Sequence, residues 1–249
     1  MYRIFYIALF LGCLLITGSG FVLFDKASFT ALSKEDAATI LKDVNHKYST
    51  SSSYSFTITH ATYAGHDALS PYEKKTGYFK KFPSGFHSFI AGVHSIQNKN
   101  YLIVIDSTQK IIMVSNPKKA SESWEMPAKE YLIGLGKCSA IKIDQGDKIK
   151  TLRLEFDKKN PISAYEFCID KNNQLQSTII FYAREVAAKK LGGKSVKPKL
   201  SMVFEHYTWK GISEKDELNE TRFITVSNNI ITLTETYKGF TLMDNRIKK

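Results

Sequence analysis

The clearest structural pattern in the sequence is YEKKTGYFKKFPSGFHSFIAGVHSIQNKNYLIVIDSTQKIIMVS, residues Tyr72–Ser115. Four β-rich runs are separated by three short polar or Gly/Pro breaks, which is the pattern of strands joined by tight turns. The runs Tyr101–Ile105 and Ile111–Val114 are apolar without alternation, which indicates strands with cover on both faces. We therefore predict an antiparallel meander within a curved sheet that wraps over apolar side chains.

Composition supports one large folded unit. The 249 residues are 43% hydrophobic and 12% aromatic, which is ample for a core and argues against disorder. The formal charge of +11 is scattered over lysine pairs, and no nucleic-acid-binding motif is present, so we expect no nucleic-acid partner. The basic surface either keeps an exported protein soluble or attracts an anionic membrane surface, and both interpretations stay open.

The N-terminal segment indicates export. Residues Ile4–Phe24 carry no charge and follow Arg3. They fit a cleaved signal peptide over residues 1–20, an uncleaved membrane anchor over residues 4–24, or a lipobox ending at Cys13. Each interpretation exports the rest of the chain. We expect a periplasmic or periplasm-facing protein with a single domain over residues 21–249, either free or held by its N-terminal segment.

The remaining pattern predicts two helices among many strands. Ser33 and Asp36 resemble a capping box that opens a helix ending within Ser49–Ser53. A second, short helix is predicted over Ala128–Leu135, with Gly136 as its stop. The predicted class is α+β and mainly antiparallel β: a curved sheet or incomplete barrel of about ten or eleven strands, with an N-terminal helix and a short inserted lid helix.

Catalytic and metal-binding patterns are absent. The sequence contains no GxSxG, HExxH or CxxC motif, so we expect no enzyme, no catalytic residue, no metal and no cofactor. His87 and His94 are seven residues apart in one predicted strand, which points them to opposite faces and excludes a shared metal. Cys138 and Cys168 either pair after export or are two small buried side chains.

The order of elements gives a family resemblance. ILKDVNHKYS, YSFTITHATY, GYFKKF, HSFIAGVHSI, YLIVID and KIIMV follow one another between Ile40 and Val114, and this series resembles the periplasmic outer-membrane lipoprotein carriers of the Lol type. The ending TETYKGFTLMDNR is similar to the close of exported proteins of this type in the Bacteroidota. The resemblance implies an incomplete antiparallel barrel, closed by helices over an apolar cavity that holds lipoprotein acyl chains.

These observations lead to two hypotheses of function. In the first, the hollow face of the sheet binds a lipid or a lipoprotein acyl chain, with the short helix as its lid. The candidate ligand contacts, each of which also fits plain core packing, are Phe56, Ile58, Phe89, Val93, Ile103, Ile105, Leu132, Leu135, Phe181 and Phe204. In the alternative, the chain is a membrane-anchored structural or interaction protein of the envelope with a packed, ligand-free interior.

Overall fold

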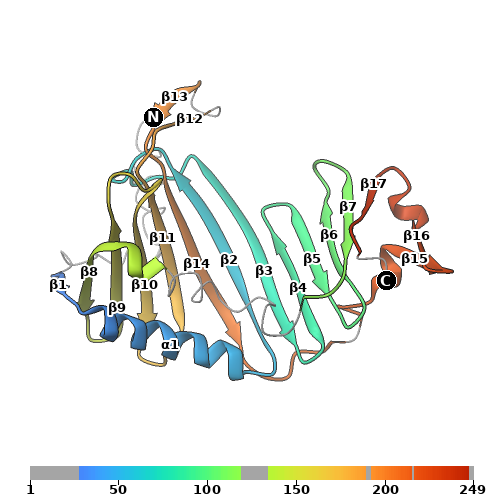
Figure 1. Ribbon diagram of the computed structural model, residues 1–249, viewed down its shortest axis with the longest axis horizontal. Helices are drawn as coiled ribbons and strands as arrows, with labels where there is room; N and C mark the ends of the chain where they lie inside the picture. The colour runs from blue at the N-terminus through green and yellow to red at the C-terminus, as the bar shows by residue number, and fades with distance from the viewer. Residues whose placement is uncertain (1–27, 119–133, 189–191, 215, 247–249) are drawn as a thin grey trace, which may run out of the picture.

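The computed structural model describes residues 28–118, 134–188, 192–214 and 216–246, and most of them form one curved sheet of 13 strands (Figure 1). Within these residues the sheet does not close into a barrel, because β1 and β17 lie at its two ends. In spatial order the strands are β1 (Thr30–Ala31), β8 (Cys138–Gln145), β9 (Ile149–Phe156), β10 (Ile162–Asp170), β11 (Leu175–Tyr182), β14 (Lys199–Thr208), β2 (Tyr54–Tyr63), β3 (Glu73–Phe82), β4 (Gly85–Ile90), β5 (Val93–Gln97), β6 (Leu102–Asp106), β7 (Ile111–Ser115) and β17 (Thr241–Asp244).

The predicted fold class is confirmed, although the strands are more numerous than expected. Every pairing in the large sheet is antiparallel except that of β17 with β7, which is parallel. Two small hairpins add further strands: β12 (Val186–Ala188) with β13 (Lys194–Val196), and β15 (Ile224–Ser227) with β16 (Ile230–Leu233). β13 lies in the basic range 189–198, which the sequence had predicted to be a loop.

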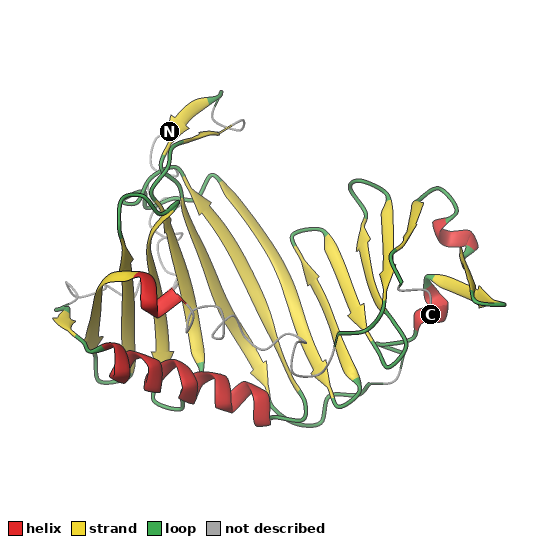
Figure 2. Cartoon of the chain, in the orientation of Figure 1, coloured by secondary structure: helices red, strands yellow, loops and turns green. Residues whose placement is uncertain are grey.

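The N-terminal helix forms where the sequence predicted it. α1 (Lys34–Thr50) begins after Ser33, whose hydroxyl accepts a hydrogen bond from the Asp36 amide at 3.0 Å and donates one to the Asp36 carboxylate at 2.7 Å. Figure 2 shows α1, the only α-helix among the described residues, crossing the near face of the sheet. Its buried side chains are Ala37, Leu41, Val44 and Tyr48.

The meander has five strands, β3 to β7, where four were predicted. The run FHSFIAGVHSIQ is broken by a tight turn at Ala91 and Gly92, whose φ angles are 54° and 93°. Positive φ at both central residues is the geometry of a two-residue hairpin turn. Glycine adopts this backbone freely but alanine rarely does, so Ala-Gly is a weak turn signal. The sequence alone therefore did not predict a turn here.

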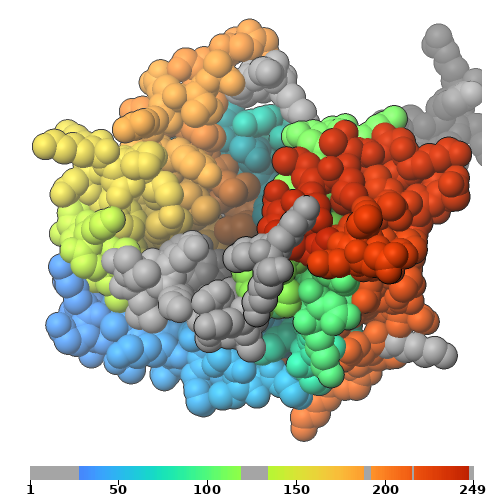
Figure 3. All heavy atoms as spheres, turned by 45° about the vertical axis from the view of Figure 1, so that its right-hand side comes forward, coloured from blue at the N-terminus to red at the C-terminus, as the bar shows by residue number. Residues whose placement is uncertain are grey.

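Two hydrophobic clusters lie on opposite faces of the sheet. The first packs α1 and the turn η1 (Leu135–Lys137) against the hollow face of β2, β3, β8, β9, β10, β11 and β14. The second packs residues 212–240, which include η3 (Glu220–Arg222), η4 (Glu235–Tyr237) and the β15–β16 hairpin, against the outer face of β4 to β7. Figure 3 shows these C-terminal residues (red) gathered on one side of the molecule, away from α1 (blue).

The structure corrects some of the predictions from sequence, and others concern residues outside the described part. Most of the predicted helix at residues 128–135 lies outside the described residues; its described end is the 3₁₀ turn η1, which runs through Gly136 rather than stopping there. Cys138 and Cys168 are free thiols. Residues 1–27 are outside the described part, so the signal, anchor and lipobox interpretations and the domain boundary stay predictions. No helix in the described part has the length and apolar character needed to cross a membrane.

Candidate functional site

The hollow face of the meander is where the packed core ends. Residues paired across antiparallel strands point to the same face, so the register places Phe79, Ser88, Ser95, Val104 and Met113 in one row across β3 to β7. Phe79 is 1% exposed beneath the first cluster. Farther along the row, Val104 and Met113 are only half-buried and belong to neither hydrophobic cluster.

We name Val93, Val104, Met113 and Met243 the aliphatic stripe. Val93 lies on the same face at the start of β5, and Met243 of β17 pairs with Met113 in the parallel register. Met243 is 42% exposed. The four residues of the stripe belong to neither cluster, and among the described residues they form a partly exposed apolar surface.

A cavity of about 450 Å³ lies at the C-terminal end of α1. Its floor is aromatic, with Tyr48 from α1 and Phe79 and Phe86 from the hollow face of β3 and β4. The β3–β4 and β5–β6 turns form its rim. The lining residues are Tyr48, Ser49, Phe79, Lys81, Phe82, Pro83, Ser84, Gly85, Phe86, Gln97, Asn98, Lys99, Pro117 and Lys118.

Close backbone approach shapes one wall of the cavity. A Cβ atom on Gly85 would lie 1.8 Å from the carbonyl oxygen of Gln97, so only glycine lets β4 and β5 meet here. The structure thus gives this glycine a steric role. The buried Gln97 amide then donates to the carbonyl oxygen of Lys118 and accepts from the Lys118 amide, each at 3.1 Å. This double hydrogen bond holds Lys118 at the rim.

The C-terminal segment fixes the two turns of the rim. Asn98 Oδ1 accepts from the amides of Asn100 and Tyr101 at 2.8 and 2.9 Å, which closes the β5–β6 turn. Its Nδ2 donates to the carbonyl oxygen of Leu218 at 3.0 Å and to Glu220 at 2.7 Å. Ser84 in the β3–β4 turn hydrogen-bonds Glu214. The rim is therefore rigidly placed by contacts from the outer side of the sheet.

The charge of the cavity is positive. Among the described residues, three lysines line it, Lys81, Lys99 and Lys118, and no aspartate or glutamate does. Lys81 Nζ donates to the carbonyl oxygens of Tyr48 and Ser49 at 3.0 and 3.4 Å, so its charge stabilises the C-terminal end of α1. Lys99 and Lys118 are exposed at the mouth.

The ligand contacts predicted from sequence are divided between the two faces. Phe56, Ile58, Phe204 and Leu135 are buried in the first cluster, on the side of α1. Ile103 and Ile105 are each 1% exposed in the second cluster, on the opposite face. The prediction failed for Ile103 and Ile105 because β6 is apolar on both faces. Its sequence therefore does not reveal which of its side chains point into the hollow.

The other four predicted contacts are also dispersed. Val93 belongs to the stripe, and Leu132 lies outside the described residues. Phe89 is on the outer face, with its ring centroid 4.5 Å from that of His94. Phe181 is also on the outer face, beneath the guanidinium of Arg153 at 5.0 Å. Whether any of the ten residues contacts a ligand stays a prediction.

His87 and His94 lie together, contrary to the prediction from sequence. The Ala91-Gly92 turn puts them on neighbouring strands, with Nε2 of His87 3.4 Å from Nδ1 of His94. Burial lowers the pKa of both imidazoles, although Glu217, 2.7 Å from Nδ1 of His87, opposes this for His87. The earlier reason for excluding a shared metal is therefore wrong; in the described ranges, no group of three or more His, Cys, Asp or Glu residues is placed to hold a metal.

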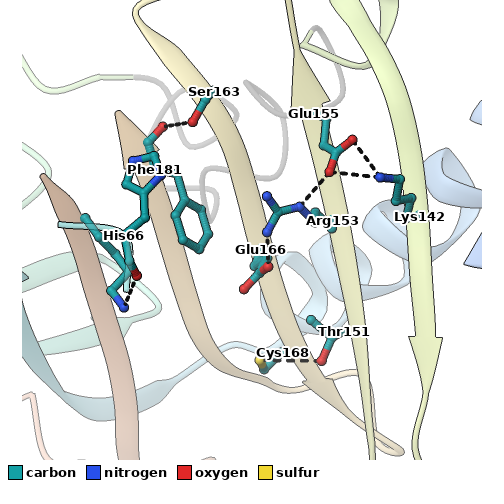
Figure 4. A network of polar contacts seen from close by, with 10 residues as sticks. His66, Lys142, Thr151, Arg153, Glu155, Ser163, Glu166, Cys168 and Phe181 are labelled. Carbon is teal, nitrogen blue, oxygen red and sulfur yellow. Dashed lines mark hydrogen bonds and ion pairs between the residues drawn. The ribbon is translucent and has the colours of Figure 1, made fainter. Parts of the chain in front are cut away.

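The outer face of β8 to β11 is polar. Figure 4 shows Arg153 between Glu155 and Glu166, with Lys142 also on Glu155 at 2.9 Å. Burial alone would raise the pKa of the Glu155 carboxyl, but the hydrogen bonds from Lys142 and Arg153 outweigh it and lower the pKa. Cys168 is beside the Thr151 hydroxyl at 3.8 Å in the same view. These ion pairs therefore lie on the face of the sheet opposite to α1.

No family model matches the chain, and no curated protein matches it either. Among solved structures, 44 chains match. They include an uncharacterized conserved protein from Thermus thermophilus (TM-score 0.46, 9% identity, 84% of this chain and 99% of that chain covered). Two others are the Mycobacterium tuberculosis lipoprotein LppX (0.38, 11%, 73% and 99%) and a LolA superfamily protein from Nitrosomonas europaea (0.29, 9%, 77% and 100%).

The resemblance predicted from sequence thus reappears among the structural matches. At these identities and TM-scores the likeness carries no functional inference, so function has to come from this chain's own residues.

Sequence reasoning missed the cavity-lining residues Phe79, Phe86 and Gln97. A usable signal was present. Counting outward from the turn at Pro83 and Ser84 pairs Lys81 with Phe86, and the next turn pairs Phe86 with Gln97. Lys81, Phe86 and Gln97 therefore lie on the hollow face, and so does Phe79, two residues before Lys81. The second step fails without the Ala91-Gly92 turn, because a one-residue error in register reverses every face.

Proposed function

We propose that this protein binds an acyl chain or a similar apolar group in the hollow of its sheet. The observation that carries the proposal is the aliphatic stripe on the same face of the sheet as the aromatic-floored cavity. Met113 and Val104 stand in one cross-strand row with Ser95, Ser88 and Phe79, and Phe79 lines the cavity. Unbranched, polarizable methionines suit a flexible apolar ligand.

The dimensions support an acyl chain over a larger ligand. A volume of about 450 Å³ lies at the lower part of the range typical of small-molecule sites. A chain longer than the cavity would extend over the hollow face toward the stripe on β5 to β7. The alternative of a packed, ligand-free interior describes the part beneath α1 but does not account for the stripe.

The proposed setting is the cell envelope. An exported carrier, free or held by residues 4–24, would take up a lipid or acylated lipoprotein at one membrane and release it at another. The net charge of +11 favours transient contact with an anionic membrane surface. No group placed for catalysis is required for such exchange, in keeping with the expectation of a non-enzyme.

The test is lipid retention by stripe variants. Native mass spectrometry of protein purified from a membrane-containing lysate should show a co-purified acyl lipid, and Met113→Glu should lose it because a carboxylate beside the chain is costly to desolvate. Met113→Leu is the matched control, since it keeps the volume and apolar character.

Both variants should keep the melting temperature of the native chain within a few degrees, because Met113 is half-buried. The proposal fails if no lipid co-purifies and the native chain also binds no added monopalmitoylglycerol, palmitoyl lysophosphatidylcholine or palmitoyl lysophosphatidic acid.

A further inference from the structure

The polar groups that line the cavity are nearly all occupied. Besides the amides of Gln97 and Asn98 described above, the Ser49 hydroxyl donates to the carbonyl oxygen of His46 at 3.1 Å. The Tyr48 hydroxyl bonds Tyr207 at 2.8 Å and the Leu175 amide at 3.1 Å. Ser84 is held by Glu214. A ligand with an uncharged polar end therefore finds no unused hydroxyl or amide side chain among the described lining residues.

Two ammonium groups at the cavity remain available to a ligand. In the part of the chain that the structure describes, Lys99 and Lys118 have no ion-pair partner, whereas Lys81 Nζ donates to the carbonyl oxygen of Tyr48 at the end of α1. Hydrogen bonds of neighbouring residues fix the backbone at both lysines. The Gln97 side-chain amide bonds the backbone of Lys118, and Lys99 lies between Asn98 and Asn100 in the closed β5–β6 turn.

The described carboxylates near the rim form no ion pair with these lysines. Glu214 shares a second, smaller cavity with Lys99 and hydrogen-bonds Ser84. Glu220 accepts from Asn98 and Asn100 at 2.7 and 3.2 Å. Glu217 is held between Lys80 and His87 on the outer face. Each of these acids is hydrogen-bonded to another group, so the ammonium groups of Lys99 and Lys118 stay available to an anionic ligand.

We infer that the ligand of the hollow is an amphiphile with an anionic headgroup, bound with its chain on the aromatic floor and its phosphate or carboxylate oxygens at Lys99 and Lys118. This inference rests on the proposed function and narrows it, since an uncharged acyl anchor would leave both ammonium groups unused. Charge-assisted hydrogen bonds to an anionic oxygen are the interaction these groups can still make.

The experiment compares three single-chain probes with the same palmitoyl chain, below their aggregation concentrations, by isothermal titration calorimetry on the full chain. They are lysophosphatidic acid, lysophosphatidylcholine and monopalmitoylglycerol. The anionic probe should bind roughly five- to tenfold more tightly than the neutral one, as two partly exposed ion pairs would give. Added salt should reduce this preference.

The matched variants are Lys99→Gln/Lys118→Gln and Lys148→Gln/Lys171→Gln. Both pairs remove two positive charges from exposed turns, but Lys148 and Lys171 lie outside the cavity. The first pair should lose the preference for the anionic probe while keeping its affinity for monopalmitoylglycerol; the second should leave both affinities within about twofold.

The outcomes separate the two proposals. Equal affinity for the charged and neutral probes overturns the headgroup inference and leaves acyl-chain binding intact. Binding of none of the probes contradicts acyl-chain binding itself. If inorganic phosphate alone competes as well as lysophosphatidic acid does, the site recognises free phosphate, and the lipid headgroup is wrong.

Discussion

The two ends of the sheet are covered on opposite faces. Beneath α1, the hollow face of β8 to β11, β14 and β2 is a packed core, and the outer face is wet and held by ion pairs such as Arg153 with Glu166. From β5 to β7 the arrangement is reversed: the outer face is buried under residues 212–240, and the stripe on the hollow face is only partly buried. The change occurs at β3, where Phe79 packs toward α1 and Phe82 toward the C-terminal segment.

This reversal explains how one sheet can be stable and still offer an apolar surface. If α1 extended over the meander, the stripe would become core. If the C-terminal segment were missing, β5 to β7 would lose the layer under which Ile96, Ile103, Ile105, Ile112 and Val114 are buried. The ligand surface exists because stability at each end comes from a different face. Four measurements test whether the two ends differ in this way.

The largest effect is expected at the centre of the packed end. Phe56 is 2% exposed and its ring contacts Phe79, Phe204 and Tyr207. Phe56→Ala should lower the free energy of unfolding by about 3–5 kcal/mol, measured by urea denaturation. A cost below about 1 kcal/mol, together with weaker lipid retention, would mean instead that Phe56 lines a ligand cavity.

Neighbouring residues on β7 compare the two faces directly. Ile112 is 0% exposed under the C-terminal segment, whereas Met113 is half-buried on the stripe. Ile112→Ala should cost about 2–5 kcal/mol and Met113→Ala under about 1.5 kcal/mol. Only Met113→Ala should weaken acyl-chain binding. Equal stability losses would contradict the one-sided cover of the meander.

A smaller loss is expected at the hydrogen-bond ring that ties α1 to the sheet. The Leu175 amide donates to Tyr48 Oη, the Tyr48 hydroxyl donates to Tyr207 Oη, and the Tyr207 hydroxyl donates to the Leu175 carbonyl oxygen at 2.6 Å. Burial raises the pKa of Tyr48 to about 12, so the phenol stays protonated.

Tyr48→Phe leaves the Leu175 amide without its acceptor and should cost about 1–3 kcal/mol in urea denaturation. Because the ring stays in place, lipid retention should be unchanged. Loss of retention in a folded Tyr48→Phe variant would show that the hydroxyl, and not only the ring, serves the cavity.

The smallest effect is a pH dependence at the meander end. Burial lowers the pKa of His87 and His94 in the folded chain. The Arg222 charge lowers both pKa values further and the Lys80 charge lowers that of His87, whereas Glu217 opposes the shift of His87. The unfolded chain therefore binds protons more readily. Their contribution to stability is full above the unfolded pKa of about 6.5 and is lost as the pH falls from there toward the folded pKa.

The melting temperature should therefore decline as the pH falls from neutral through this window, and His94→Asn should decline less. His206→Asn is the control, because His206 is exposed on the outer face of β14 and its φ of 53° suits asparagine. Identical profiles for His94→Asn and the native chain would exclude the histidine pair as the source.

The sequence predicted the elements better than their faces. The capping box located α1 to within a residue, and alternation on β2 identified Tyr54, Phe56 and Ile58 as inward. β6 has no alternation, so Ile103 and Ile105 were assigned to the hollow although they face the C-terminal segment. Which face of a doubly apolar strand is covered depends on a segment over a hundred residues away.

The last strand of the sheet has a consequence for the rest of the molecule. β17 hydrogen-bonds β7 along its length, and β7 reads Ile-Ile-Met-Val-Ser, a short, uncharged, β-branched segment. A chain cut before Thr241 would present that segment as a bare template for strands of other molecules, the starting point of fibrous assembly. The four residues of β17 therefore protect an aggregation-prone strand edge from pairing with the same edge of other molecules.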